Sequence, residues 1–190
     1  MIWVRSRVTY NRNQRYAVAE NLSPNLLGKV DRAEDLRSPV TRALFEYWQT
    51  KRGDRAHPAW SDINLMDVYN IAPHIVVRDV VDGGREFRCR YSGTGLSAVL
   101  GVDGTGQLIA ETYRRGAAGV LTRYQTVLTA GRPLRAVAYV EAVEKNLPTA
   151  FESVYLPLSG ADGTIGHIIV AYDFTYVPTS DEPRAPGSPR

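Results

Sequence analysis

The chain has 190 residues, enough for one ordinary domain with extended ends, and its formal net charge is +3. Cys89 is the single cysteine, which excludes an intramolecular disulfide and favours a reducing compartment. No stretch approaches ~20 consecutive apolar residues, and the first residues form no signal peptide, so we expect a cytoplasmic protein without membrane spans.

Positive charge is concentrated at the N-terminus. Residues 1–19 carry four arginines and no acid, whereas residues 36–176 hold 15 basic and 14 acidic residues. This central region lacks the one-sided basic surface typical of nucleic-acid-binding proteins, so nucleic acid is not expected as a partner. Residues 1–35 show no sustained periodicity and are interpreted as an irregular basic arm, with a short strand at 2–8 left open.

The first regular element is a helix over residues 39–52. Ser38 can cap it, Pro39 suits its first position, and Gly53 can end it. The apolar stripe of this amphipathic helix is broad enough to need a partner, either a sheet face or a second copy of itself. We expect its exposed apolar side to be a homodimer or protein-partner interface, formed by Leu44, Tyr47 and Trp48.

The middle of the chain predicts a hairpin followed by helices. Residues 74–81 are β-branched and residues 85–92 alternate strictly, with Phe87, Cys89 and Tyr91 on the apolar face. The glycine-rich segment that follows has room only for a short helix near 96–100. Apolar spacing then predicts a longer helix from Thr112 to Ala130.

Three strands are predicted after that helix, at 134–143, 151–159 and 165–174. The second alternates, with Val154, Leu156 and Leu158 on one face, and the third is apolar on both faces, as in a central strand. An Asp162-Gly163 turn joins these two strands. Residues 177–190 are rich in proline, serine and arginine and are interpreted as a disordered tail.

Strands that precede and follow a group of helices are typical of an α+β domain, here over residues 36–176. We expect a five-stranded antiparallel sheet with helices on one face, preceded by the amphipathic helix. The helix at 112–130 would cover the apolar face of the sheet and leave a small cavity between them.

Five short motifs occur in an order that resembles the PAS domain family, more narrowly its small type-five branch of often stand-alone bacterial proteins. They are LFEYWQTKRG (44–53), the neighbourhoods of Asp62-Ile63 and Pro73-His74, FRCRYSGTG (87–95), GVDGTG (101–106) and LPLSGADG (156–163). The resemblance covers residues 36–176 and implies a PAS-like fold and a sensory or protein-interaction role. It implies no particular ligand.

Tyrosine hydroxyls and one arginine are the candidates to line the cavity. Buried tyrosines also commonly do no more than satisfy a backbone carbonyl, and His167, on the last strand, faces either the cavity or solvent. The candidate ligand-binding residues are Tyr91, Tyr113, Arg123, Tyr124, Tyr155 and His167.

Signatures of catalysis, metals and cofactors are missing from the sequence. The segment Gly93-Thr-Gly95 resembles a dinucleotide fingerprint, but it follows a half-solvated strand and precedes too short a helix. The three histidines share no metal-ligand spacing. Haem-binding PAS domains place a histidine on the long helix and flavin photosensors a cysteine on a short one, and this chain has neither. We therefore expect no catalytic residues, no metal and no cofactor.

The leading hypothesis is a non-enzymatic PAS-like sensory or protein-interaction module that acts in trans as a signalling adaptor, with a small ligand in the cavity left open. Two alternatives remain. One is a small enzyme that uses the same cavity, which would need a strongly perturbed acid or histidine there. The other is a nucleic-acid-associated adaptor that acts through the basic N-terminal arm.

Overall fold

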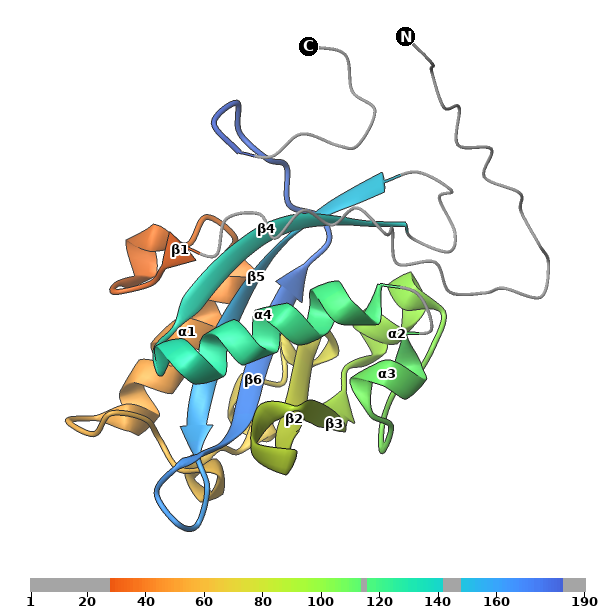
Figure 1. Ribbon diagram of the computed structural model, residues 1–190. Coiled ribbons are helices and arrows are strands. Elements are labelled where there is room, and N and C mark those ends of the chain that lie inside the picture. Colours follow the sequence, from red (N-terminus) through yellow and green to blue (C-terminus); the bar gives the residue numbers. More distant parts are fainter. Residues whose placement is uncertain (1–27, 114–115, 142–147, 183–190) are drawn as a thin grey trace, which may run out of the picture.

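The computed structural model describes residues 28–113, 116–141 and 148–182 (Figure 1). Its six-stranded sheet is antiparallel throughout, in the order β1-β4-β5-β6-β2-β3. The strands are β1 (Gly28–Lys29), β2 (Ile75–Val81), β3 (Glu86–Ser92), β4 (Leu134–Glu141), β5 (Pro148–Ser159) and β6 (Ile165–Asp173). The predicted α+β class is confirmed, and the additional strand is β1, a two-residue pairing on the edge of β4.

Four α-helices accompany the sheet in the described residues: α1 (Pro39–Arg52), α2 (Thr94–Leu100), α3 (Ile109–Thr112) and α4 (Ala117–Ala130). Short 3₁₀ turns connect the rest: η1 (Ala33–Asp35), η2 (Trp60–Asp62), η3 (Leu65–Val68), η4 (Ala72–His74) and η5 (Asp82–Gly84).

Strand β6 lies in the middle of the sheet because it is apolar on both sides. It pairs with β5 along one edge and with β2 along the other, so that Ile169 lies opposite both Leu156 and Val77. Ile168 packs on the face covered by α4, and Ile169 packs on the opposite face. A strand with two apolar faces needs cover on both, and the two long helices provide it.

Helices cover both faces of the sheet, whereas the sequence predicted helices on one (Figure 1). Helix α4 packs against a core that includes Phe87, Tyr124 and Tyr155. Helix α1 packs on the other face, where Leu44 and Trp48 join the apolar side chains of β5 and β6. The reason is the alternation of β5, which directs Val154, Leu156 and Leu158 toward α1.

Helix α1 begins and ends where the sequence predicts. The Ser38 hydroxyl accepts a hydrogen bond from the Val40 amide at 3.1 Å, and Pro39 occupies the first helical position. Gly53 ends the helix with φ +56°, a conformation that favours glycine. The Trp48 indole donates to the Pro157 carbonyl at 2.8 Å, which fixes the helix to β5.

The helix predicted from Thr112 begins later. Tyr113 has φ −112° and ψ 86°, which is not helical, and Gly116 has φ +78° directly before α4. The segment therefore divides into the short α3 and the 14-residue α4. Local apolar spacing continues across this break, so periodicity alone could not reveal it.

An irregularity in β3 reverses one predicted orientation. Val77 pairs with Tyr91, but the next residue, Arg78, pairs with Cys89, so Arg90 is an extra residue in the strand. Beyond this bulge the faces exchange. Cys89 packs under α4, while Tyr91 packs on the α1 face, contrary to the prediction that they share a face.

At both ends the domain extends beyond the predicted bounds of residues 36 and 176. Residues 28–35, assigned to the irregular arm, include β1 and η1. Residues 177–182, assigned to the disordered tail, include Glu182, which is only 7% exposed and accepts a hydrogen bond from Arg135. The open strand at 2–8 lies outside the described residues.

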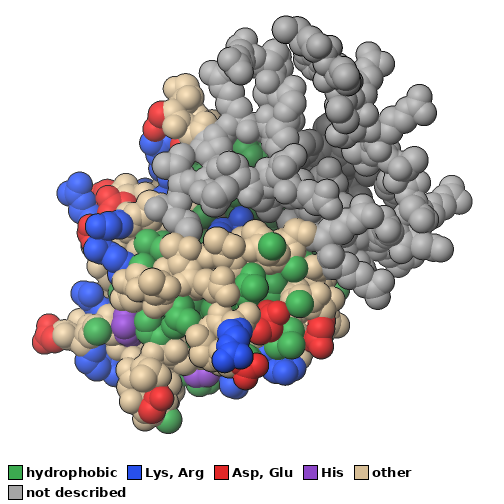
Figure 2. All heavy atoms as spheres, in the orientation of Figure 1, with side chains coloured by type: hydrophobic (Ala, Val, Ile, Leu, Met, Phe, Trp, Pro, Cys, Tyr) green, Lys and Arg blue, Asp and Glu red, His purple; other side chains and the backbone are tan. Residues whose placement is uncertain are grey.

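Positive and negative side chains are interspersed over the face shown in Figure 2, in keeping with the near-neutral sequence of the central region. Among the residues described, no helix combines the length and the apolar character required to cross a bilayer.

Candidate functional site

Two buried arginines and four buried tyrosines lie on the face of the sheet that α4 covers. Strands β2, β5 and β6 each contribute one residue, α4 contributes two consecutive residues, and one follows α3. We call this group the arginine–tyrosine cluster; its members are Arg78, Tyr113, Arg123, Tyr124, Tyr155 and Tyr172.

Arg78 is 2% exposed and has an aromatic environment. Its guanidinium carbon lies 5.5 Å from the ring centre of Tyr124 and 5.7 Å from that of Tyr113. Nη2 approaches the Tyr113 hydroxyl at 3.4 Å, but Nε and Nη1 have no hydrogen-bond partner. Burial acts to lower the pKa of Arg78, whereas Tyr124 and Tyr113 act to raise it, and the net pKa lies above its ordinary value, so the group stays charged.

Arg123 repeats this pattern from the helix side. It is 7% exposed, and its Nε has no hydrogen-bond partner. Burial lowers its pKa, while Tyr155, Tyr172 and Tyr124 raise it above its ordinary value. The Tyr155 hydroxyl lies near enough to influence this pKa, yet its oxygen forms no hydrogen bond of acceptable geometry.

The tyrosines form a connected aromatic wall. The Tyr124 ring packs edge-on against Tyr155 with 5.4 Å between ring centres, and the Tyr124 and Tyr172 hydroxyl oxygens lie 3.4 Å apart. Burial raises the pKa of both Tyr124 and Tyr172, so both hydroxyls remain protonated at neutral pH and can donate hydrogen bonds.

The cluster is therefore costly as it stands. A buried cation without a counter-charge loses its hydration, and a buried N–H without an acceptor loses a hydrogen bond. Cation–π contacts return roughly 2 kcal/mol when desolvated, which is less than the penalty of several kcal/mol for each buried ion. This arrangement makes the cluster a candidate binding site, because a ligand could supply the missing acceptors.

Four of the six predicted ligand-binding residues belong to the cluster: Tyr113, Arg123, Tyr124 and Tyr155. The other two lie on the opposite face. Tyr91 is carried there by the bulge, and its hydroxyl donates to the Ala72 carbonyl at 3.1 Å. His167 alternates with Ile168 on β6, so its ring packs beside Trp60 and its Nδ1 lies 2.7 Å from an Asp79 carboxylate oxygen.

The predicted interface residues are not exposed as expected. Leu44 and Trp48 are 0% and 1% exposed in the core between α1 and the sheet. Tyr47 is half-buried, and its hydroxyl donates to the Asn64 carbonyl at 3.0 Å. The sheet itself buries the apolar stripe of α1. A second copy of the helix is not needed to bury it.

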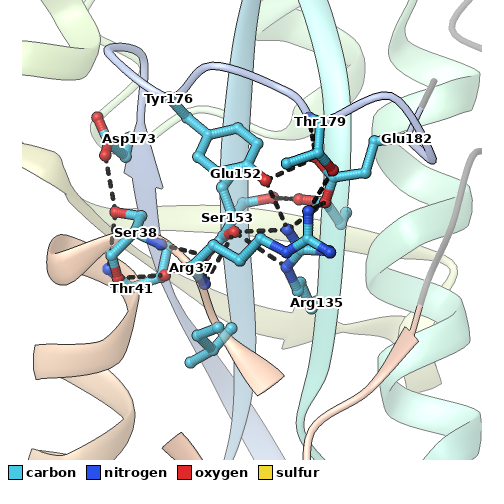
Figure 3. Close-up of polar contacts among 12 residues, drawn as sticks. Arg37, Ser38, Thr41, Arg135, Glu152, Ser153, Asp173, Tyr176, Thr179 and Glu182 are labelled. Atoms are coloured by element: carbon cyan, nitrogen blue, oxygen red, sulfur yellow. Dashed lines mark hydrogen bonds and ion pairs between the residues drawn. The ribbon is translucent and has the colours of Figure 1, made fainter. Parts of the chain in front are cut away.

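A second buried polar group surrounds Glu152 at the start of α1 (Figure 3). The Glu152 carboxylate is fully buried and accepts hydrogen bonds from the Arg37 and Ser38 amides and from Thr41 Oγ1. Arg135, its diagonal neighbour on β4, donates from Nη2 at 2.7 Å and from Nε at 3.0 Å. We call these residues and the segment that follows β6 the Glu152 network.

The segment after β6 closes this network. Glu182 accepts hydrogen bonds at 2.6 Å from both Arg135 and the Tyr176 hydroxyl. Burial and the hydrogen bond to Glu182 raise the pKa of Tyr176 to about 12. Arg37 forms ion pairs with Asp181 and Glu182 at 3.3 and 3.5 Å. Each charged group here has an opposite partner, so the network stabilises the fold rather than awaiting a ligand.

Three features of the sequence relevant to metal or cofactor binding can be compared with the structure: the possible metal ligands, Cys89 and Gly93. In the part of the chain that the structure describes, no group of three or more histidine, cysteine, aspartate or glutamate side chains could hold a metal ion. Cys89 lies buried beneath α4, and burial raises the pKa of its thiol. A Cβ on Gly93 would lie 2.3 Å from the Pro73 carbonyl oxygen, so this glycine permits backbone packing and leaves no room there for a phosphate.

Sequence reasoning missed Arg78, Tyr172 and Glu152. Arg78 and Glu152 each interrupt an otherwise apolar strand face, whereas Tyr172 continues one. Arg78 follows three buried residues of β2, and Glu152 alternates with Val154 and Leu156. A charged residue in phase with buried neighbours was the available signal, because such a residue needs a partner in the interior.

The comparison with known families agrees with this architecture. The family model described as a PAS domain matches residues 36–172, most of the chain. A search of curated proteins finds no match.

Solved structures offer distant likenesses. A sensory box sensor histidine kinase from Vibrio cholerae is 17% identical, with a TM-score of 0.39 over 57% of this chain and 87% of that one. A fungal LOV domain photoreceptor is 11% identical, also with a TM-score of 0.39, over 60% of this chain and 93% of that one. The extent of the family match is what decides the assignment, and the chain therefore belongs to the PAS domain family of sensory modules.

Proposed function

We propose that this PAS domain is a cytoplasmic, non-catalytic sensor that holds a small molecule against the arginine–tyrosine cluster and acts in trans on a partner protein. The observation that carries the proposal is the pair of unpaired donors on Arg78, Nε and Nη1, in a residue only 2% exposed. A bound molecule would supply the acceptors that the fold does not.

Helix α4 is the element whose packing would change when a ligand binds. It contributes Arg123 and Tyr124 to the cluster, and its Gln125 side chain donates to the Gly84 carbonyl at 3.1 Å, which ties it to the turn between β2 and β3. A ligand that draws Arg123 toward itself would shift α4 against the sheet. The equilibrium between two such packings is what a sensor passes to its partner.

Native mass spectrometry combined with hydrogen exchange tests the proposal. The protein as purified is compared with protein that has been unfolded in urea, dialysed and refolded. We expect an additional small-molecule mass in the first sample and slower amide exchange in α4 than in the second. A single mass equal to that of the chain, together with the same α4 exchange in both samples, would contradict ligand sensing.

A further inference from the structure

We propose that the molecule held at the arginine–tyrosine cluster is a small organic carboxylate, bound by Arg78 and Arg123. The inference rests on the proposed function and names the chemical class of its ligand. Nothing in the sequence patterns or in the family match specifies that class.

The unpaired polar atoms of the cluster are all able to donate hydrogen bonds. They are Nε and Nη1 of Arg78, Nε of Arg123 and the hydroxyl of Tyr155. Guanidinium groups are donors only, and an ionised carboxylate is an acceptor only, with about four lone-pair sites on its two oxygens. A neutral ligand with one carbonyl oxygen would leave about half of these donors unpaired, whereas one carboxylate has as many acceptor sites as there are unpaired donor atoms.

Charge leads to the same class of ligand. The strongest electrostatic influences on Arg78 and Arg123 are tyrosines and Cys89, and none of these neighbours carries a carboxylate. The acid nearest in sequence to Arg78 does not compensate it, because Asp79 points to the other face and pairs with Arg90 and His167. Ordered water could accept the hydrogen bonds, but only an anion would also offset the buried positive charge.

The surroundings select the rest of the molecule. Apolar side chains border the cluster, among them Phe87, Phe151, Ile168 and Val170. An apolar body next to the carboxylate would pack against them, whereas inorganic phosphate would have to give up its hydration against apolar walls. Because the cluster residues are at most 8% exposed, the ligand would be enclosed and could leave only when α4 opens.

Matched pairs of probes separate charge from shape. Ligand-stripped, refolded protein is titrated with benzoate and benzamide, and with hexanoate and hexanamide, and the thermal midpoint and Kd are measured. We expect each carboxylate to raise the midpoint and its neutral amide to bind at least about tenfold more weakly, as for the loss of a charge-assisted hydrogen bond. Benzoate and hexanoate distinguish an aromatic from an aliphatic body, and binding of either supports the inference.

Variants then assign the binding to the two arginines. Arg78→Met and Arg123→Met should weaken the better carboxylate about tenfold to hundredfold, while Arg85→Met, which removes an exposed arginine, should leave its Kd unchanged. If a methionine variant does not fold, Arg123→Lys keeps the charge but loses the planar donor arrangement, and it should also weaken binding.

The outcomes separate this inference from the proposed function. Equal binding of acid and amide, tighter binding of inorganic phosphate, or an uncharged co-purified molecule would overturn the carboxylate assignment and leave ligand sensing intact. If no probe binds and the purified protein carries no additional mass, both are overturned. A co-purified carboxylic acid whose binding is lost in Arg78→Met would establish both.

Discussion

Arg135 and Arg78 are both largely buried arginines on strands of one sheet, yet their surroundings differ completely. Arg135 donates to two carboxylates, Glu152 and Glu182, within 2.6 to 3.0 Å. Arg78 faces tyrosine rings and retains two unpaired nitrogens. The first environment is complete within the chain itself. The second is incomplete, and this difference distinguishes a structural polar network from a site that expects a ligand.

The largest effect is expected from Glu152→Gln. This change removes the fully buried one of the two carboxylates that pair with Arg135 and weakens the hydrogen bonds at the start of α1, so the free energy of unfolding should fall by about 3–5 kcal/mol. Urea denaturation measures it, with Glu34→Gln as an exposed control. A loss below about 1 kcal/mol would mean that the Glu152 network does not stabilise the fold, so that Arg135 and Arg78 would not differ in role.

Replacing Arg78 by methionine and replacing Arg135 by methionine should change the free energy of unfolding in opposite directions. Arg78→Met removes an uncompensated buried charge and should raise the free energy of unfolding of the ligand-free protein by about 1–2 kcal/mol. Arg135→Met removes the cation shared by the Glu152 and Glu182 carboxylates and should lower it. The same urea titrations provide the measurement. If both variants are destabilised alike, then Arg78 has a structural role that the contacts do not reveal.

Trp48→Phe tests the contribution to stability of the packing between α1 and the sheet, on the face opposite the arginine–tyrosine cluster. It removes the hydrogen bond to the Pro157 carbonyl and part of a buried side chain, so we expect a loss of about 1–2 kcal/mol. Carboxylate binding should be unchanged, because the two faces are separated by the sheet. Tyr47→Phe, at a half-buried position on the same helix, is the milder companion variant. A changed benzoate Kd in Trp48→Phe would show that the faces are coupled.

The smallest expected effect is on the loss of stability at low pH, through the carboxylate of Asp173. Burial raises the pKa of Asp173, but hydrogen bonds from Thr175 and Ser38 lower it more, so the net pKa lies below its ordinary value. A lowered folded-state pKa contributes stability that is present above the unfolded-state pKa, near 4, and lost as the pH falls through the folded-state value. Asp173→Asn should therefore reduce the decline in stability between about pH 4 and pH 2. An unaltered pH profile would mean that Asp173 does not contribute to the acid dependence of stability.

Local signals were sufficient for most of the fold. Ser38, Pro39 and Gly53 mark the ends of α1, and the Asp162-Gly163 turn joins β5 to β6. The central place of β6 followed from its apolar residues on both faces. These features depend on neighbours in sequence or on a strand's own composition, and such information is contained in a short stretch of chain.

The face on which each side chain lies was harder to predict, because it depends on contacts between distant segments. Tyr91 continues a regular alternation in sequence, and only the pairing of β3 with β2 reveals that Arg90 is an inserted residue. The apolar stripe of α1 predicted a covering surface, but the sequence of the helix did not indicate whether that surface was the sheet or a second copy of the helix. Four of the six members of the arginine–tyrosine cluster were predicted, and Arg78 and Tyr172 were missed because their importance comes from convergence in space.

The position of β6 also determines how the chain can assemble as it is synthesised. The strand that joins β5 to β2 is the last of the six to emerge, so the two halves of the sheet have no shared edge until residues 165–173 are available. Until then the apolar stripe of α1 has only part of its covering surface. Such dependence on distant pairings slows folding and prolongs exposure to aggregation, so chaperone engagement should be greatest for nascent chains that end before Ile165.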